Sequence, residues 1–73
     1  MNIVDMTIHI HNDLLPAQRE KLEKEIRVFD GVTLVRCSSK INYGMFVIYD
    51  SESISAGKIL NRVRQWDKNA TIF

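Results

Sequence analysis

Residues 6–32 read MTIHIHNDLLPAQREKLEKEIRVFDGV and contain a strand, a polar break and a helix. Apolar side chains occupy every second position of residues 6–10, which is the pattern of a strand with one buried face. Pro16 is typical of the first turn of a helix, because the amide that proline lacks has no helical partner there. Gly31 is typical of the left-handed residue that follows a helix. We therefore predict a strand followed by a helix that begins near Pro16 and ends before Gly31.

The remaining residues predict two more strands, a second helix and a short last strand. Residues 32–37 form the second strand, and residues 45–49, MFVIY, are apolar on both faces, which favours a central strand. Ser53 or Ser55 is expected to cap the second helix, and residues 71–73 form the last strand. The predicted inward stripes are Leu22, Ile26 and Phe29, extended by Leu15 and Ala17, in the first helix, and Ala56, Ile59, Leu60, Val63 and Trp66 in the second.

The order of these elements predicts the fold class. Strand, helix, strand, strand, helix, strand is the order of the ferredoxin-like βαββαβ sandwich, an α+β fold with a four-stranded antiparallel sheet and two helices on one face. In that topology residues 6–10 and 45–49 form the central pair of strands. A chain of 73 residues is expected to make one domain over residues 1–73, with its core in roughly residues 4–73.

Composition excludes several classes of function and setting. The net charge of +1 lacks the basic excess of nucleic-acid-binding proteins. Cys37 is the only cysteine, so no internal disulfide or all-thiolate metal cage can form, and a reducing compartment is expected. By alternation with Val35, it is expected to face the core as a small buried hydrophobe. The sequence shows no signal peptide and no membrane-spanning apolar run, so we expect a cytoplasmic protein that binds neither nucleic acid nor membrane.

Four stretches of the sequence resemble one known family. They are DGV at residues 30–32, MFVIYD at residues 45–50, SISAGKIL at residues 53–60 and NATI at residues 69–72. With the strand, loop and helix that precede them, they resemble the heavy-metal-associated domain of copper chaperones, the mercury-binding periplasmic protein and metal-pumping ATPases. The resemblance spans roughly residues 6–73 and implies the same ferredoxin-like fold.

The sequence departs from this family at the metal-binding motif. The family carries Met-x-Cys-x-x-Cys at the start of its first helix, and counting back from Gly31 and Val32 places the three motif positions on Asp13, Leu15 and Gln18. None of these residues is a cysteine. Leucine and a neutral amide cannot supply the thiolates that bind Cu(I) or Hg(II). The resemblance therefore implies a degenerate metal site, and no resident cofactor is expected.

A different set of residues offers an alternative metal site. His9 and His11 are two apart in and just after the first strand, so both imidazoles project to one face, and Asp13 follows in the turn. Two nitrogen ligands and a carboxylate suit a divalent Zn, Ni or Cu ion. The competing interpretation gives these residues ordinary roles on the sheet surface and in the turn. A transition-metal binding or carrier domain is therefore the alternative function.

The sheet face away from the helices carries the other unusual pattern. Alternate residues of the strand at 45–49 are expected to point into the core, which leaves the other two pointing outward. An open sheet face is normally polar, and a contiguous apolar patch on it is typical of a docking surface. The predicted docking face consists of Phe46, Ile48, Leu34 and Arg36. The alternative is that Ile3 or Val4 from the N-terminal tail covers the patch.

No arrangement of residues in the sequence indicates an enzyme. Neither Ser38 nor Ser39 has an identifiable base, and no glycine-rich phosphate loop is present. We therefore predict a non-enzymatic domain of the heavy-metal-associated type that acts as a protein-docking or dimerisation module. Its partner, another protein or a second copy, is expected to bind at the open sheet face.

Overall fold

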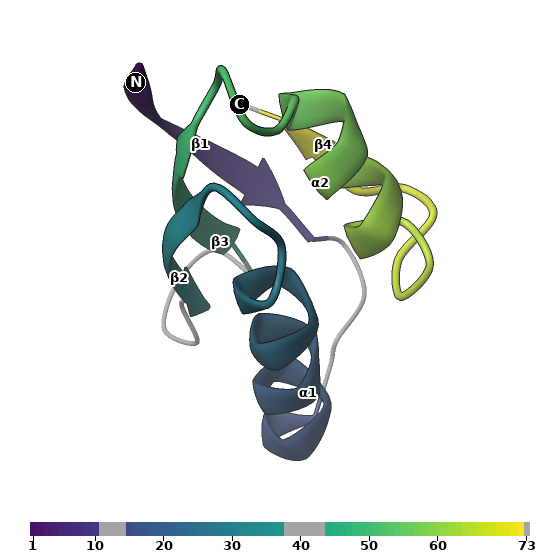
Figure 1. Ribbon diagram of the computed structural model, residues 1–73. Coiled ribbons are helices and arrows are strands. Elements are labelled where there is room, and N and C mark those ends of the chain that lie inside the picture. Colours follow the sequence, from purple (N-terminus) through teal and green to yellow (C-terminus); the bar gives the residue numbers. More distant parts are fainter. Residues whose placement is uncertain (11–14, 38–43, 73) are drawn as a thin grey trace.

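The computed structural model describes residues 1–10, 15–37 and 44–72 of the chain. Its elements follow the predicted order (Figure 1). They are β1 (Ile3–His9), α1 (Pro16–Arg27), β2 (Val32–Cys37), β3 (Gly44–Asp50), α2 (Ala56–Val63) and β4 (Thr71–Ile72). Within these described residues, neither helix has the length and apolar character that crossing a membrane requires.

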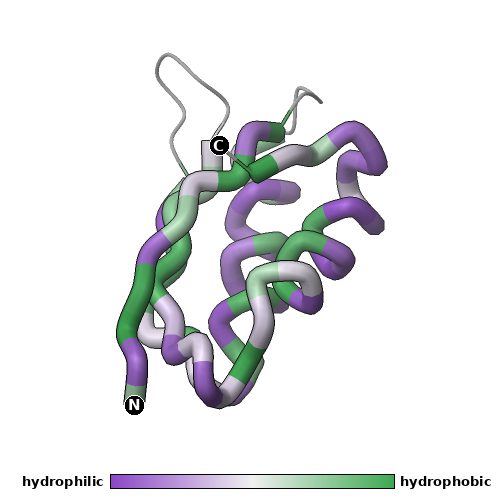
Figure 2. The backbone as a smooth tube through the Cα atoms, turned by 90° about the horizontal axis from the view of Figure 1, so that it is seen from above, coloured by the Kyte–Doolittle hydropathy of each residue, from purple (hydrophilic) through white to green (hydrophobic). Residues whose placement is uncertain are grey.

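The strands form an antiparallel sheet in the order β2-β3-β1-β4. β1 and β3 are the central pair, and their register runs from Ile3 opposite Asp50 to His9 opposite Gly44. Both helices lie on the same side of the sheet, as Figure 2 shows with the strands to one side and the helices to the other. The arrangement confirms the predicted ferredoxin-like α+β fold.

The core lies between the helices and the inner face of the sheet. The sheet contributes the buried residues Met6 and Ile8 from β1 and Met45 and Val47 from β3. The period-2 pattern of the sequence therefore predicts which side chains of each strand point into the core. The helices contribute the buried residues Leu22, Ile26, Ile59 and Val63, with Phe29, Ala56, Leu60 and Trp66 packed against the core. The predicted inward stripes are confirmed for these residues.

The predicted extension of the first stripe to Leu15 and Ala17 is wrong. Both residues are exposed, and Leu15 is 65% exposed. The helix begins at Pro16, and Leu15 precedes it with an extended backbone. Its side chain therefore does not follow the helical spacing that places a residue on the stripe. Ala17, in the first turn, falls on the outer side of the helix.

Gly31 forms the turn between α1 and β2. Its φ of 94° lies in the left-handed region that glycine adopts without strain, as predicted. The turn is closely packed, because the Gly31 carbonyl oxygen accepts a hydrogen bond from the Asp50 amide at 2.7 Å. A Cβ at position 31 would lie 2.7 Å from the Cβ of Ser53. Any side chain here would therefore strain the backbone and overlap the loop that follows β3.

We expect Gly31→Ala to lower the free energy of unfolding by about 2 kcal/mol or more, because it combines a positive φ with a steric overlap. Gly57→Ala is the matched control, since no atom lies within 4 Å of a Cβ added at Gly57 in α2. This second substitution should raise stability by up to about 1 kcal/mol. Urea unfolding followed by circular dichroism measures both. Equal effects of the two substitutions would contradict this account of the turn.

Candidate functional site

The positions that the family resemblance assigns to the metal motif lie at the start of α1. Leu15 precedes the helix and Gln18 is in its first turn, while Asp13 lies outside the described residues. The Leu15 amide donates a hydrogen bond to Gln18 Oε1 at 2.8 Å, so the two positions are adjacent in space. This bond is one half of a capping box, and leucine has no side-chain oxygen for the other half. The pair thus provides an apolar group and an amide oxygen already bonded to the backbone.

The structure describes one of the three residues of the alternative metal site. His9 is the last residue of β1, where it is partly buried and lies opposite Gly44 on β3 and Thr71 on β4. His11 and Asp13 fall outside the described residues, so this site stays a prediction. Within the parts of the chain that the structure describes, no three His, Cys, Asp or Glu side chains are grouped so that they could hold a metal ion.

Cys37 lies at the end of β2, on the side of the sheet that faces α1. Its amide donates a hydrogen bond to Glu23 Oε1 at 2.7 Å, and its Sγ is 3.9 Å from the Arg19 carbonyl oxygen. These residues, with Pro16 and Glu20, line a shallow depression of about 170 Å³. The side chain faces the core as expected, but at the edge of the sheet it is only partly buried.

The surroundings of Cys37 keep its thiol protonated. Burial and then the negative charge of Glu23 raise the pKa of the thiol from 9.0 to about 12, while Arg19 acts in the opposite direction. The thiolate is the form that attacks electrophiles and binds metals. The raised pKa therefore leaves Cys37 with a smaller fraction of thiolate at neutral pH than an ordinary cysteine has.

The open face of the sheet lies opposite the helices. It is formed by the strand residues that alternate with the buried core residues along each strand. Cross-strand pairing arranges six of them in two rows over β2, β3 and β1. One row is Arg36, Phe46 and Thr7, and the other is Leu34, Ile48 and Asp5. The four residues of the predicted docking face therefore share this face, and their role in docking stays a prediction.

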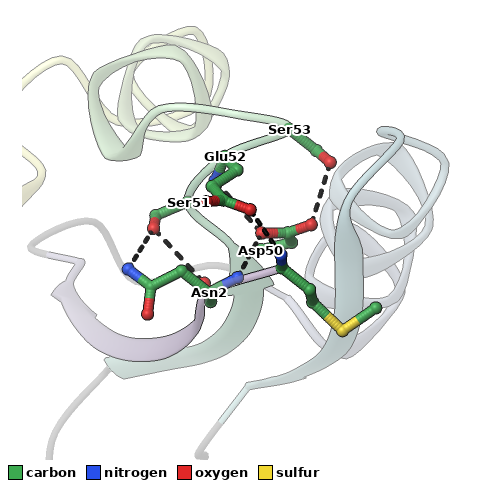
Figure 3. Close-up of polar contacts among 6 residues, drawn as sticks. Asn2, Asp50, Ser51, Glu52 and Ser53 are labelled. Carbon is green, nitrogen blue, oxygen red and sulfur yellow. Dashed lines mark hydrogen bonds and ion pairs between the residues drawn. The ribbon is translucent and has the colours of Figure 1, made fainter.

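The N-terminal residues are bonded to the loop after β3. The Asn2 amide donates a hydrogen bond to Asp50 Oδ1 at 2.9 Å, and its carbonyl oxygen accepts one from the Ser51 amide at 2.9 Å (Figure 3). The Asp50 carboxylate also accepts from the Glu52 amide and the Ser53 hydroxyl. These bonds, with that from Asn2 foremost, hold the pKa of Asp50 below its ordinary value. The start of β1 is thus fixed against the end of β3.

This anchoring places the tail residues in the sheet. Val4 packs against the core, whereas Ile3 lies on the open face and is 49% exposed. The alternative in which Ile3 or Val4 covers the apolar patch is therefore wrong. Ile3 and Asp5 are members of the open face that the sequence-based prediction missed, and extending the period-2 pattern of β1 backwards from Met6 would have found both. We call Ile3, Leu34, Phe46 and Ile48 the apolar strip.

At pH 8, native Cys37 should react with iodoacetamide at least about tenfold more slowly than Cys37 in the urea-unfolded chain, because its raised pKa leaves few thiolates. Mass spectrometry of the alkylated chain over time gives both rates. Glu23→Gln removes the negative charge and should speed the native reaction. Equal rates in the native and unfolded chain would show that the thiol is not shielded.

No protein-family model and no curated protein matches the chain, whereas several solved structures do. Oxidized MerP from Ralstonia metallidurans CH34 matches with a TM-score of 0.83 at 16% sequence identity, over 96% of this chain and 96% of MerP. The CsoZ metallochaperone matches with a TM-score of 0.76 at 21% identity, over 97% of each chain. Identities this low establish the fold only. The chain therefore has a heavy-metal-associated-like, ferredoxin-like fold, and Leu15 and Gln18 occupy the positions that the sequence resemblance assigns to the paired cysteines.

Proposed function

We propose that the chain is a non-enzymatic protein-docking module that binds another folded protein through the open face of its sheet. The main support for this proposal is the apolar strip, which crosses three neighbouring strands on the face opposite both helices. Monomeric proteins rarely expose contiguous large apolar side chains, and such patches mark interaction sites.

The strip is contiguous and accessible. Leu34 is directly opposite Ile48, and Ile3 is the diagonal neighbour of Ile48 across the β1–β3 pair, within reach of a large side chain. Ile3 is 49% exposed and Phe46 is 38% exposed, while the other two members are partly buried. A partner that covers the strip removes apolar surface from water, which contributes about 25 cal/mol for each Å² before the entropic costs of association are subtracted.

Two charged residues beside Phe46 and Ile48 define the chemistry of the partner. Arg36 lies next to Phe46 on β2, and Asp5 lies next to Ile48 on β1, so the charges occupy opposite corners of the face. Neither of the two forms an ion pair with any residue that the structure describes. The proposed partner is therefore a folded protein whose apolar surface carries a carboxylate near Arg36 and a cation near Asp5.

The rest of the described chain supports a binding role. Cys37 is protonated at neutral pH, and the start of α1 presents Leu15 and Gln18 where thiolates would be needed for soft-metal chemistry. We place the module in the reducing cytoplasm, where a lone cysteine stays in the thiol form.

We expect Phe46→Thr to lower the free energy of unfolding of the monomer by about 1 kcal/mol or less, because threonine suits a strand and position 46 lies outside the core. Val47→Thr is the matched control on the same strand. It places a hydroxyl in the core and should cost about 2 to 3 kcal/mol. Urea unfolding at low protein concentration measures both. If Phe46→Thr costs as much as Val47→Thr, the strip belongs to the folding core and the docking proposal fails.

A second candidate function is transition-metal binding or carriage by His9, His11 and Asp13, with a Zn, Ni or Cu ion as cargo. The observation in its favour is the likeness in fold to the CsoZ metallochaperone. The two functions use different residues, because the strip consists of Ile3, Leu34, Phe46 and Ile48, whereas the metal set begins at His9, the last residue of β1.

If the chain carries metal, an amide NMR titration should show stoichiometric binding of Zn(II), Ni(II) or Cu(II) around His9. Binding should be lost in the His9→Ala/His11→Ala variant, and it should weaken at acid pH because protons compete for the imidazole nitrogens. Asp30→Asn, at an exposed carboxylate outside the set, is the control that should leave binding intact. Undiminished binding by the double histidine variant would remove this candidate.

A further inference from the structure

The open face itself has the chemistry that its proposed partner requires. It is apolar in the middle, with a cation at one corner and a carboxylate at the opposite corner. We propose that the partner is a second copy of the chain, bound face to face in a symmetric dimer. This inference rests on the docking function proposed above and names the occupant of the docking face.

The pairing of the strands determines how two such faces can meet. The corners of the face are Arg36 and Asp5 on one diagonal and Leu34 and Thr7 on the other, with Phe46 and Ile48 between them on β3. A symmetric dimer has a two-fold axis, and for two faces that oppose each other this axis lies in the plane between them. The direction of the axis in that plane decides which residues meet.

One direction of the axis brings opposite charges together. An axis along the diagonal from Leu34 to Thr7 exchanges the other two corners, so Arg36 of each copy meets Asp5 of the partner subunit and two ion pairs form. An axis along the other diagonal sets like charges against each other. Two further axes remain, one parallel to β3 and one perpendicular to it. With either of them, Arg36 and Asp5 of one copy lie over Leu34 or Thr7 of the other copy, so both charges are desolvated without an opposite charge nearby. Electrostatics therefore selects the first axis.

The same axis covers the middle of the apolar strip. It passes between Phe46 and Ile48, so the apolar side chains at the middle of the two faces pack against each other. The strands of the two sheets then cross steeply, towards the orthogonal mode of face-to-face sheet packing. A net charge of +1 for each chain adds little repulsion between the copies. The ion pairs lie at the rim and fix the orientation of the dimer, while the strip supplies its affinity.

The test is a charge-exchange experiment on the full chain, measured by sedimentation equilibrium from micromolar to millimolar concentration. The 8.5 kDa wild type should approach twice that mass as its concentration rises. In a dimer of the Asp5→Arg variant or of the Arg36→Asp variant, positions 5 and 36 carry the same charge, so each of the two ion pairs becomes a repulsion. Either substitution should raise the dissociation constant by about tenfold or more. An equimolar mixture of the two variants pairs each introduced charge with an opposite one. The mixture should therefore associate about as tightly as the wild type.

The controls separate this interface from a general effect of charge. Lys68→Asp makes the same charge change as Arg36→Asp at an exposed lysine outside the face, and it should leave self-association unchanged. Thermal unfolding shows whether each variant is folded. For a variant that does not fold, the wild type in rising NaCl is the substitute measurement, because screening of the ion pairs should weaken the dimer.

The outcomes distinguish the dimer from the docking function. Recovery of association in the mixture, with the Lys68→Asp control unaffected, supports the dimer with this axis. Association that is insensitive to both charge reversals and to salt overturns it. A wild type that stays monomeric at millimolar concentration, while Phe46→Thr keeps its stability, overturns the second copy as partner and leaves the face to a different protein. A large loss of stability in Phe46→Thr overturns the docking function itself.

Discussion

The antiparallel register between β1 and β3 constrains the rest of the molecule. Because side chains alternate between the two faces of a strand, a slip of one residue would expose Met6 and Ile8 and carry polar residues into the core. One end of this register is held by Asp50, whose carboxylate accepts a hydrogen bond from the Asn2 amide just before β1, while its own amide donates one to the Gly31 carbonyl oxygen just before β2. The turn at Gly31 and the anchored N-terminus therefore both fix the last residue of β3. This keeps the apolar face of the sheet under the helices.

The same register produces the apolar strip. β1 alternates between apolar and polar side chains and suits a sheet with one solvent face, whereas β3 is apolar on both faces. A strand such as β3 belongs in a sheet that is covered on both sides, yet α1 and α2 pack on the same side (Figure 2). The inner half of β3 is satisfied within the chain, and the outer half, Phe46 and Ile48, is left for a second layer. In the function proposed above, a docked partner supplies this second layer.

Periodicity and turn chemistry were sufficient to predict the order of the elements and the buried stripes, because each depends on residues close in sequence. The prediction failed where a side chain's environment depends on an exact boundary. Leu15 is apolar and one residue outside α1, and the alternative in which Ile3 or Val4 covers the patch failed because β1 begins at Ile3, three residues before the predicted start. The partial burial of Cys37 depends on α1 packing over the end of β2, which no local pattern encodes. His11 and Asp13 lie outside the described residues.

The positions that the sequence resemblance assigns to the metal motif lie outside the core, so the fold does not depend on which side chains occupy them. Leu15 is 65% exposed, and Gln18 uses its side chain to cap the helix, so neither position is part of the core cluster. Replacing thiolates there removes soft-metal ligands while the helix keeps a bonded N-terminus. The strip differs in that apolar surface stays in contact with water, because Ile3 and Phe46 are exposed and Leu34 and Ile48 are only partly buried. Likeness in fold therefore says little about chemistry at the start of α1, and the open sheet face is the part of this chain on which the proposed docking function depends.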